Sequence, residues 1–299
     1  MGSPLTRRGA LTVASILLLT ACAEKAPTNS ADGVGDDAGL TTTTVRGEDS
    51  GATTTSAKRA GTGSSTRGSG QGASPPSGAT VNAANGEPGA YAGVLLGPGS
   101  ADAIVVDVLV QSGVTPSSDA LSRLPDILGQ ASGKPVTVNG PAPLTSSNSV
   151  HSASEIRAAA DEQDHASQTA RRAVIHLLYF AGAYTDDKAL GVIVRGDTIA
   201  IFPEQIDAAT SPLVGRARLE RAVLTHELGH AMGLVDLYLD GNRDDSDHPG
   251  HSTNRSSVMF WAVETDVVSQ ILGGPPPVDF DDADRIDLAR IRSGAASQM

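Results

Sequence analysis

The groups in this sequence most suited to chemistry are two histidines and a glutamate, His226, Glu227 and His230, in the stretch HELGHAMG. Residues i and i+4 of a helix lie on one face about one turn apart, so the two imidazoles can bind the same metal ion. Glu227 then stays beside the first imidazole, where a general base is needed. The spacing H-E-x-x-H therefore predicts a Zn2+ site on a helix, with His226 and His230 as ligands and Glu227 as the catalytic base.

The residues around this motif predict the helix that carries it, from about residue 215 to residue 233. One stripe of this helix has spacings of 4, 3, 4 and 3 residues: Leu219, Val223, His226, His230 and Gly233. We expect the stripe, and both histidines with it, to face the interior of the domain. A buried helix with histidines in ordinary core positions is the alternative, but a pair at i and i+4 with an adjacent glutamate favours the metal site.

The residues after His230 resemble the metzincin family of zinc proteases, whose pattern is H-E-x-x-H-x-x-G-x-x-H. Gly233 matches the glycine, which lets the chain turn sharply at the end of the helix because it tolerates a positive φ. The third histidine of the family would stand at position 236, where this sequence has Asp236. Aspartate also binds zinc, and the variant ending in aspartate resembles the small secreted bacterial proteases called snapalysins. Asp236 is therefore one candidate for the third ligand.

His251 is the other candidate. The segment HSTNRSSVM, residues 251 to 259, has the matrixin spacing H-S-x(6)-M. It also resembles the archaemetzincin pattern H-C-x(4)-C-x-M, with serine at both cysteine positions. The resemblance implies an insertion before the third ligand, and it makes Met259 the Met-turn, an apolar floor beneath the metal. We favour His251 because histidine is the commoner zinc ligand; Asp236 stays as the alternative, and His248 is a weaker one.

The segments before the motif predict an α/β fold. Apolar, β-branched stretches indicate strands at residues 103–110, 135–138 and 173–180, and a fourth strand region at 190–194 and 199–202. Helices are expected at residues 117–133 and 154–169, and a loop at 140–151. Strands alternating with helices predict a mixed, mostly parallel sheet. The order resembles the metzincin catalytic domain, which implies that residues 199–202 form the edge strand to which an extended substrate adds.

A last helix is expected at residues 280–291, with acidic residues at its start and arginines at its end, as the helix dipole favours. Ile286, Ala289 and Arg290 share one face of this helix with Ala283, so we expect that face to pack behind Met259. Four aspartates in the insertion, at positions 240, 244, 245 and 247, are interpreted as a solvated acidic loop. A structural calcium site is the alternative, but the EF-hand spacing is absent.

Residues 1–22 have the pattern of an export signal. Arg7 and Arg8 precede an apolar stretch from residue 10 to 20, which is shorter than the ~20 residues that span a bilayer. The stretch ends in LTAC, which resembles the bacterial lipobox and implies signal cleavage before Cys22 and lipidation (palmitate) of its thiol. We therefore expect a lipoprotein anchored to the extracytoplasmic face of the cell membrane. An ordinary signal peptide with an incidental cysteine is the alternative.

Residues 23–88 are rich in Thr, Ser, Gly and Pro and almost lack large apolar side chains. They are expected to form a disordered tether, because so little apolar surface cannot offset the entropy of ordering. Residues 89–299 then form one domain. The net charge of −12 argues against nucleic acid as a partner. No oligomeric state is predicted.

Together these features predict a zinc-dependent endopeptidase that hydrolyses peptide bonds of extracytoplasmic proteins. The expected mechanism is that Glu227 takes a proton from a zinc-activated water and passes it to the leaving amine. One alternative is a surface lipoprotein that binds zinc without being an enzyme. A closed site with four protein ligands would support that alternative. A hydrolase of some non-protein amide is a further alternative.

Overall fold

The computed structural model describes residues 83–162, 171–239 and 243–295. The export signal, Cys22 and the tether as far as residue 82 lie outside these residues, so the predictions made for them stay predictions. Among the described residues, no helix has both the length and the apolar character needed to cross a membrane. Ala84 is already buried in the core, so the described fold begins a few residues before residue 89.

A five-stranded sheet with the order β2-β1-β4-β7-β6 is the centre of the domain. Its strands are β1 (Ala103–Gln111), β2 (Val136–Leu144), β4 (Arg172–Tyr179), β6 (Gly191–Arg195) and β7 (Thr198–Ile201). Every neighbouring pair is parallel except β6 and β7, which are antiparallel. The predicted mixed α/β fold with a mostly parallel sheet is confirmed.

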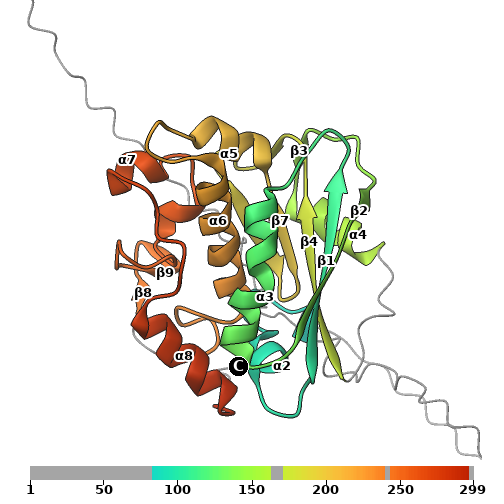
Figure 1. Cartoon of the computed structure of the whole chain (residues 1–299), viewed down its shortest axis with the longest axis vertical. Helices are drawn as coiled ribbons and strands as arrows, with labels where there is room; N and C mark the ends of the chain where they lie inside the picture. Colours follow the sequence, from blue (N-terminus) through green and yellow to red (C-terminus); the bar gives the residue numbers. More distant parts are fainter. Residues whose placement is uncertain (1–82, 163–170, 240–242, 296–299) are drawn as a thin grey trace, which may run out of the picture. The chain divides into compact units, whose positions relative to one another are not determined.

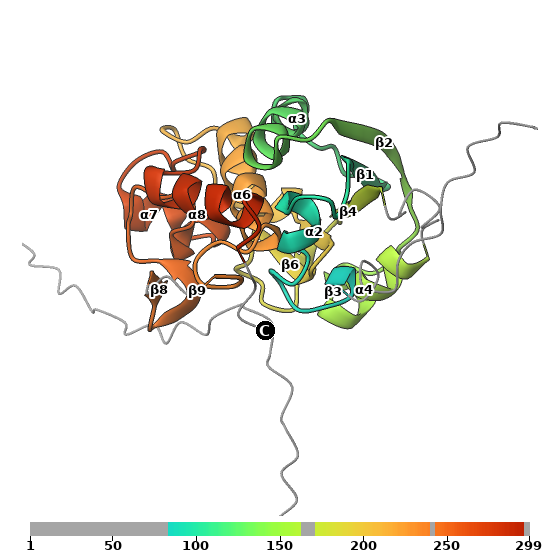
Figure 2. The same ribbon diagram turned by 90° about the horizontal axis from the view of Figure 1, so that it is seen from below.

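Helices cover both faces of this sheet (Figures 1 and 2). The helices α3 (Ser118–Ser132) and α6 (Arg216–Ala231) pack on one face, and α4 (Ala153–Asp161) packs on the other. Strand β4 serves both layers: Ile175 and Leu177 belong to the core under α3 and α6, whereas Leu178 belongs to the core under α4. Successive side chains of a strand point to opposite faces, so burial on both faces explains the continuous apolar stretch read from the sequence.

Helix α3 begins and ends where its capping residues predict. The side chain of Ser117 accepts a hydrogen bond from Ala120 N, and Gly133 ends α3 in the left-handed conformation. Helix α3 continues through Pro125. Ser152 starts α4 with a capping box completed by Glu155. The remainder of the helix expected to reach residue 169 falls largely on 163–170, outside the described residues.

The loop predicted at residues 140–151 is wrong in two places. Strand β2 continues through Pro141 and Pro143 to Leu144, because β2 is an edge strand where a missing N–H costs no ladder hydrogen bond. The short strand β3 (Val150–His151) pairs with β5 (Ala183–Tyr184) in a separate two-stranded sheet.

The edge strand was also predicted wrongly. Residues 199–202 belong to the β7 segment, and β7 pairs on both sides, with β4 and with β6. The break at Arg195-Gly196-Asp197 is the turn of a tight hairpin, since Arg195 pairs with Thr198. The chain therefore folds back on itself, and β6 takes the edge position instead of β7.

The C-terminal elements lie on the side of α6 away from β1 and β2 in both views (Figures 1 and 2). They are β8 (Asp244–Asp245), β9 (His248–Ser252), the 3-10 helix η2 (Trp261–Glu264), α7 (Val268–Leu272) and α8 (Asp282–Arg292). Two short helices complete the described fold, α2 (Ala92–Leu96) and α5 (Pro203–Ala209).

Helix α8 forms where it was predicted, but its predicted inner face is wrong. Ile286 is 61% exposed, and the buried positions include Asp284 and Asp287. Both aspartates bind the guanidinium of Arg243, at 2.6 and 2.7 Å respectively. These ion pairs bury a polar side of the helix. The spacing of apolar residues does not predict a buried face that is held by ion pairs.

Candidate metal centre

The three residues of the H-E-x-x-H motif lie in the second half of α6, where every side chain from residue 222 to residue 231 is buried. The exposed fractions of His226, Glu227 and His230 are 0%, 0% and 3%. The helix is thus enclosed on all sides here, between the sheet and the C-terminal elements, rather than buried along a single stripe. Burying charged or polar groups so completely is costly unless they are paired or bind a metal ion.

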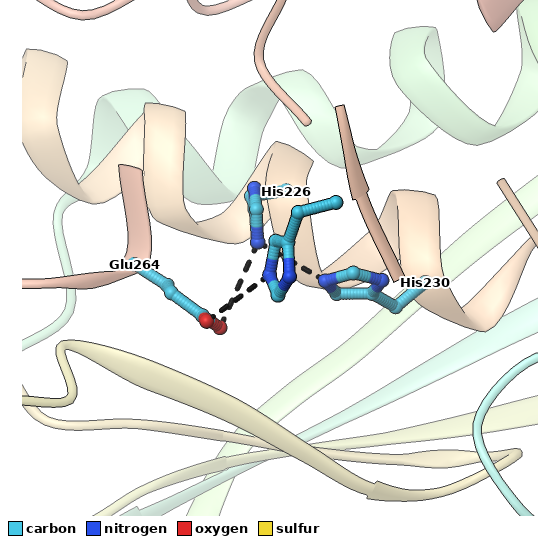
Figure 3. A group of neighbouring side chains, drawn as sticks. His226, His230 and Glu264 are labelled. Carbon is cyan, nitrogen blue, oxygen red and sulfur yellow. Dashed lines mark hydrogen bonds and ion pairs between the residues drawn. The ribbon is translucent and has the colours of Figure 1, made fainter. Parts of the chain in front are cut away.

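Two further side chains reach the motif from other elements: His251 from β9 and Glu264 from η2. One donor atom from each of His226, His230, His251 and Glu264 can be chosen so that all four lie within 4.8 Å of one another. All four residues are buried. In Figure 3 the carboxylate of Glu264 points at the imidazoles that project from α6.

The distances between the donor atoms are short and similar. His226 Nε2 lies 3.0 Å from His230 Nε2, and His251 Nε2 lies 3.1 Å from Glu264 Oε1. Glu264 Oε2 lies 3.6 Å from His226 Nε2. Ligands about 2.0–2.1 Å from one tetrahedral ion lie roughly 3.3 Å from one another, so the four side chains are spaced as ligands of one ion would be.

Backbone carbonyls orient two of the imidazoles. His226 Nδ1 lies 2.7 Å from the carbonyl oxygen of Val258, and His251 Nδ1 lies 3.1 Å from that of Pro249. A carbonyl oxygen can only accept, so in the neutral rings Nδ1 carries the hydrogen and Nε2 keeps its lone pair. In both rings that lone pair faces the cluster, which is the arrangement that outer hydrogen bonds give to metal-binding histidines.

Burial and neighbouring groups shift the pKa values of His230 and Glu264 in the cluster. Burial, together with the nearby His226 and His251, holds the pKa of His230 well below 6.5. Burial alone would raise the pKa of Glu264, but the charge of His251 and hydrogen bonds from His226 and His251 outweigh it and lower that pKa. Three imidazoles and a carboxylate are a donor set that suits zinc.

Glu227 stands beside this group without belonging to it. Its carboxylate lies near the backbone N–H of Ile193 and the carboxyl group of Glu264, and a Cβ on Gly191 of strand β6 would lie 3.2 Å from its Cγ. Burial, and then the charge of Glu264, raises the pKa of Glu227 well above 4.5. Glu227 is therefore a desolvated carboxyl group held between the helix and the edge strand, as a general base would be.

Asp236, the alternative third ligand, is not part of the group. The chain turns at Gly233, whose φ is 76°, and the next left-handed residues are Val235 and Asp236, with φ of 52° and 62°. Asp236 Oδ2 accepts hydrogen bonds from the backbone N–H of Arg243, at 2.8 Å, and of Asp244, at 3.2 Å. Its carboxylate thus holds the returning end of the insertion.

The other candidates in the insertion also find partners elsewhere. His248 lies 3.3 Å from Asp245 and stacks on Trp261, with ring centroids 4.2 Å apart. Asp245 accepts a hydrogen bond from Asp247 N, and Asp244 accepts one from Gly250 N. These aspartates organise the β8–β9 hairpin, in keeping with the interpretation as an acidic loop.

Met259 lies directly under the helix turn that separates the two histidines. It is fully buried, and a Cβ on Gly229 would lie 2.2 Å from its sulfur atom. Its backbone carbonyl accepts from Ser252 N at 2.8 Å, beside His251. The residue therefore packs against the helix, and its backbone carbonyl holds the strand that carries His251; its role as the Met-turn stays a prediction.

Sequence reasoning missed Glu264. The residue ends an apolar stretch from Val258 to Val263, and a charged side chain in that setting was the available signal. Glu264 is far from the helix in sequence, and the metzincin pattern has no ligand at its place, so the sequence did not mark it as a candidate. Only the packing of η2 against α6 brings Glu264 to the histidines.

Fold and cluster together define a class: an α/β domain with a buried group of three histidines and a carboxylate under an antiparallel edge strand. No protein-family model matches the sequence, and a comparison with curated proteins finds no match either. Solved structures do show similarity. The archaemetzincin of Archaeoglobus fulgidus, determined in complex with malonate, shares 12% identity with a TM-score of 0.37 and covers 61% of this chain and 97% of its own.

Two further solved structures are similar to the same extent. The archaemetzincin of Methanopyrus kandleri shares 16% identity with a TM-score of 0.41, covering 65% of this chain and 97% of its own. A zinc-dependent peptidase from Methanocorpusculum labreanum (strain Z) shares 15% identity with a TM-score of 0.38, covering 61% of this chain and 99% of its own.

Proposed function

We propose that this chain is a zinc-dependent endopeptidase, with His226, His230 and His251 as zinc ligands and Glu227 as the general base. The observation that carries the proposal is the convergence of three buried imidazoles from two separate elements beside a buried carboxyl group, Glu227, that is not one of the donors. A structural metal site has no use for such a carboxyl group. A hydrolytic site requires one, because a water molecule must lose a proton as it attacks.

Zinc in this centre supplies Lewis acidity, which polarises a carbonyl and lowers the pKa of water, and a positive charge that favours the ionised form of Glu227. The chain's own residues then divide the remaining work. The Val258 and Pro249 carbonyls hold two imidazoles in the correct tautomer. The Glu227 carboxylate takes the proton of the attacking water and delivers it to the nitrogen of the leaving amine.

The location of the enzyme is part of the proposal. The lipobox-like stretch ending in Cys22 supports an exported lipoprotein, and the long Thr/Ser/Gly/Pro-rich segment supports a tether that holds the domain away from the membrane. On this basis we propose that the substrates are extracytoplasmic proteins or peptides. Labelling with a radioactive fatty acid in a bacterial expression host, lost in Cys22→Ala, tests the anchor.

The direct test of the mechanism is Glu227→Gln, measured for zinc content and for digestion of a broad peptide library. Glutamine keeps the shape of the side chain but cannot take the proton. We expect the variant to bind zinc as the unchanged protein does and to lose hydrolysis by at least ~100-fold, the usual contribution of a general base. Hydrolysis that survives in Glu227→Gln would remove Glu227 from the mechanism.

A second function is favoured by one observation, the presence of Glu264 as a fourth donor. Structural zinc sites are closed by four protein ligands, whereas catalytic sites keep one position open. A zinc-binding lipoprotein without enzymatic activity would fit a permanently closed site. It predicts zinc binding without digestion of any library peptide, in the unchanged protein and in all Glu264 variants alike.

A further inference from the structure

We propose that Glu264 is a fourth metal ligand that closes the centre in the resting protein and must swing away before a substrate can bind. This inference rests on the proposed function, because it concerns the same centre. It assigns Glu264 a role as a built-in latch, a carboxylate of the folded domain that competes with the substrate for the last position on the metal.

The carboxylate of Glu264 is directed at the imidazole cluster. Both of its oxygens face the cluster, Oε1 at 3.1 Å from His251 Nε2 and Oε2 at 3.6 Å from His226 Nε2 (Figure 3). Glu264 is only 6% exposed. A glutamate so buried needs partners for its charge, and its nearest polar neighbours are imidazoles that are themselves placed as metal ligands. The carboxylate therefore points at the position that a metal ion held by the histidines would present to it.

Glu227 is the other buried carboxyl group near the centre. Glu227 follows His226 directly on α6, yet it does not join the group of donors. Glu264 comes from a different element and does join it. The two carboxyl groups thus occupy different places, Glu227 against the edge strand and Glu264 across the imidazoles. Glu227 can therefore be the base while Glu264 is a ligand.

The backbone of Glu264 is fixed. Its carbonyl oxygen accepts a hydrogen bond from Leu190 N at 2.7 Å, and the next residue, Thr265, forms an isolated antiparallel bridge with Ala189. Asp266 N donates to the carbonyl oxygen of Lys188 at 3.0 Å. The segment around Glu264 is therefore paired with residues 188–190, which lead directly into the edge strand β6.

Opening the centre thus requires rotation of the Glu264 side chain and not movement of its backbone. Side-chain rotation is a small and fast change, so the latch can yield to a competing donor without any rearrangement of the fold. The pairing with residues 188–190 also places the latch next to the start of β6, so a substrate that contacts this edge would lie beside it.

The test uses the full chain loaded with Co2+ in place of zinc, since Co2+ reports its ligands through its visible spectrum. The variants are Glu264→Gln, which keeps the shape of the side chain, and Glu264→Ala, which removes the donor. Glu220→Gln is the matched control, because Glu220 is also a buried glutamate, at 0% exposure on α6, but is not in the metal group. Unfolding curves without metal establish that each variant folds.

We expect both Glu264 variants to change the Co2+ spectrum and to bind zinc at least tenfold more weakly in competition with a chromophoric chelator. We expect acetohydroxamate, a small metal-binding probe, to alter the spectrum of the variants at concentrations that leave the unchanged protein and Glu220→Gln unaffected. Identical spectra, and equal response of all four proteins to acetohydroxamate, would overturn the proposal.

Digestion of the peptide library by the same proteins separates this inference from the proposed function. A latch predicts severalfold faster digestion by Glu264→Ala than by the unchanged protein. If no protein digests any peptide while the spectra change as expected, the ligand assignment holds and the peptidase proposal fails. If the unchanged protein digests peptides while the spectra do not change, the peptidase proposal holds and the latch is wrong.

Discussion

The sulfur atom of Met259 lies so close to Gly229 that a Cβ on that glycine would be 2.2 Å from it and 2.9 Å from the methionine's terminal methyl group. Gly229 directly precedes His230 and follows His226 by three residues, so the contact lies on the helix turn between the two histidines. The absence of a side chain at residue 229 allows the segment from Val258 to Met259 to approach the helix, and that approach brings the Val258 carbonyl within reach of His226.

We predict that Gly229→Ala destabilises the protein by about 1 kcal/mol despite the higher helix propensity of alanine. Overpacking of a core costs roughly 1–3 kcal/mol, and the gain in propensity offsets about 1 kcal/mol of it. Urea unfolding without metal measures the change. In a Met259→Ala background the added methyl group has room, so the same substitution should there be neutral or stabilising. Equal destabilisation in both backgrounds would show that the Gly229–Met259 contact is not the cause.

The third ligand is tested by comparing His251→Ala with Asp236→Asn. His251 lies in the cluster, so its loss should weaken zinc binding by more than ~100-fold. That is more than the usual effect of losing a residue that only hydrogen-bonds to a metal ligand. Asp236 binds backbone N–H groups of the insertion, and asparagine can still accept these hydrogen bonds, so zinc binding should be retained. Competition with a chelator measures both affinities. The reverse pattern would restore Asp236 as the ligand.

The anchoring of the insertion is tested at Arg243. Its guanidinium binds Asp284 and Asp287 of α8, and the Asp284 side chain is fully buried and also accepts a hydrogen bond from the Ser257 hydroxyl. Arg243→Met leaves the Asp284 carboxylate without its cationic partner, and breaking a mostly buried pair of this kind costs about 2–3 kcal/mol.

Arg285→Met is the matched control for Arg243→Met, because Arg285 lies on α8, as do Asp284 and Asp287, and pairs with the exposed Asp282. Exposed pairs contribute little, so we expect no measurable change in its unfolding midpoint. Comparable losses in the two variants would mean that the buried cluster does not anchor the insertion.

The pH dependence of stability is tested at Glu220. Burial raises the pKa of this carboxyl group above 4.5, although hydrogen bonding from Ser117 N and the charge of Arg216 act in the opposite direction. The folded state therefore holds the Glu220 proton more tightly than the unfolded state, and this group costs stability as the pH rises from about 4.5 upward. Glutamine does not titrate and avoids that loss.

We accordingly predict that the stability of Glu220→Gln relative to the unchanged protein increases between pH 4.5 and 7, measured by urea unfolding without metal. Glu87→Gln, the same substitution at an exposed glutamate, is measured alongside. A relative stability of Glu220→Gln that falls with pH would contradict the assignment of burial as the dominant effect.

The local patterns of this chain predicted most of the fold. Apolar stretches placed β1 and β4, and Ser117 and Gly133 placed the ends of α3, because capping and β-branched burial act over a few residues. The predictions that turned out wrong depend on distant partners. Which of β6 and β7 takes the edge is decided by pairing with β4, and which face of α8 is buried is decided by Arg243 from the insertion.

What the sequence determined by itself is the pair His226 and His230 with Glu227 between them, since helical spacing alone places these side chains together. It also favoured His251 over Asp236 as the third ligand, through the spacing to Met259. Only the tertiary structure decided that Asp236 binds the backbone of the insertion and that Glu264 joins the histidines. The physical reason is distance along the chain: β9 and η2 reach the helix through packing and backbone hydrogen bonds between segments that no local pattern connects.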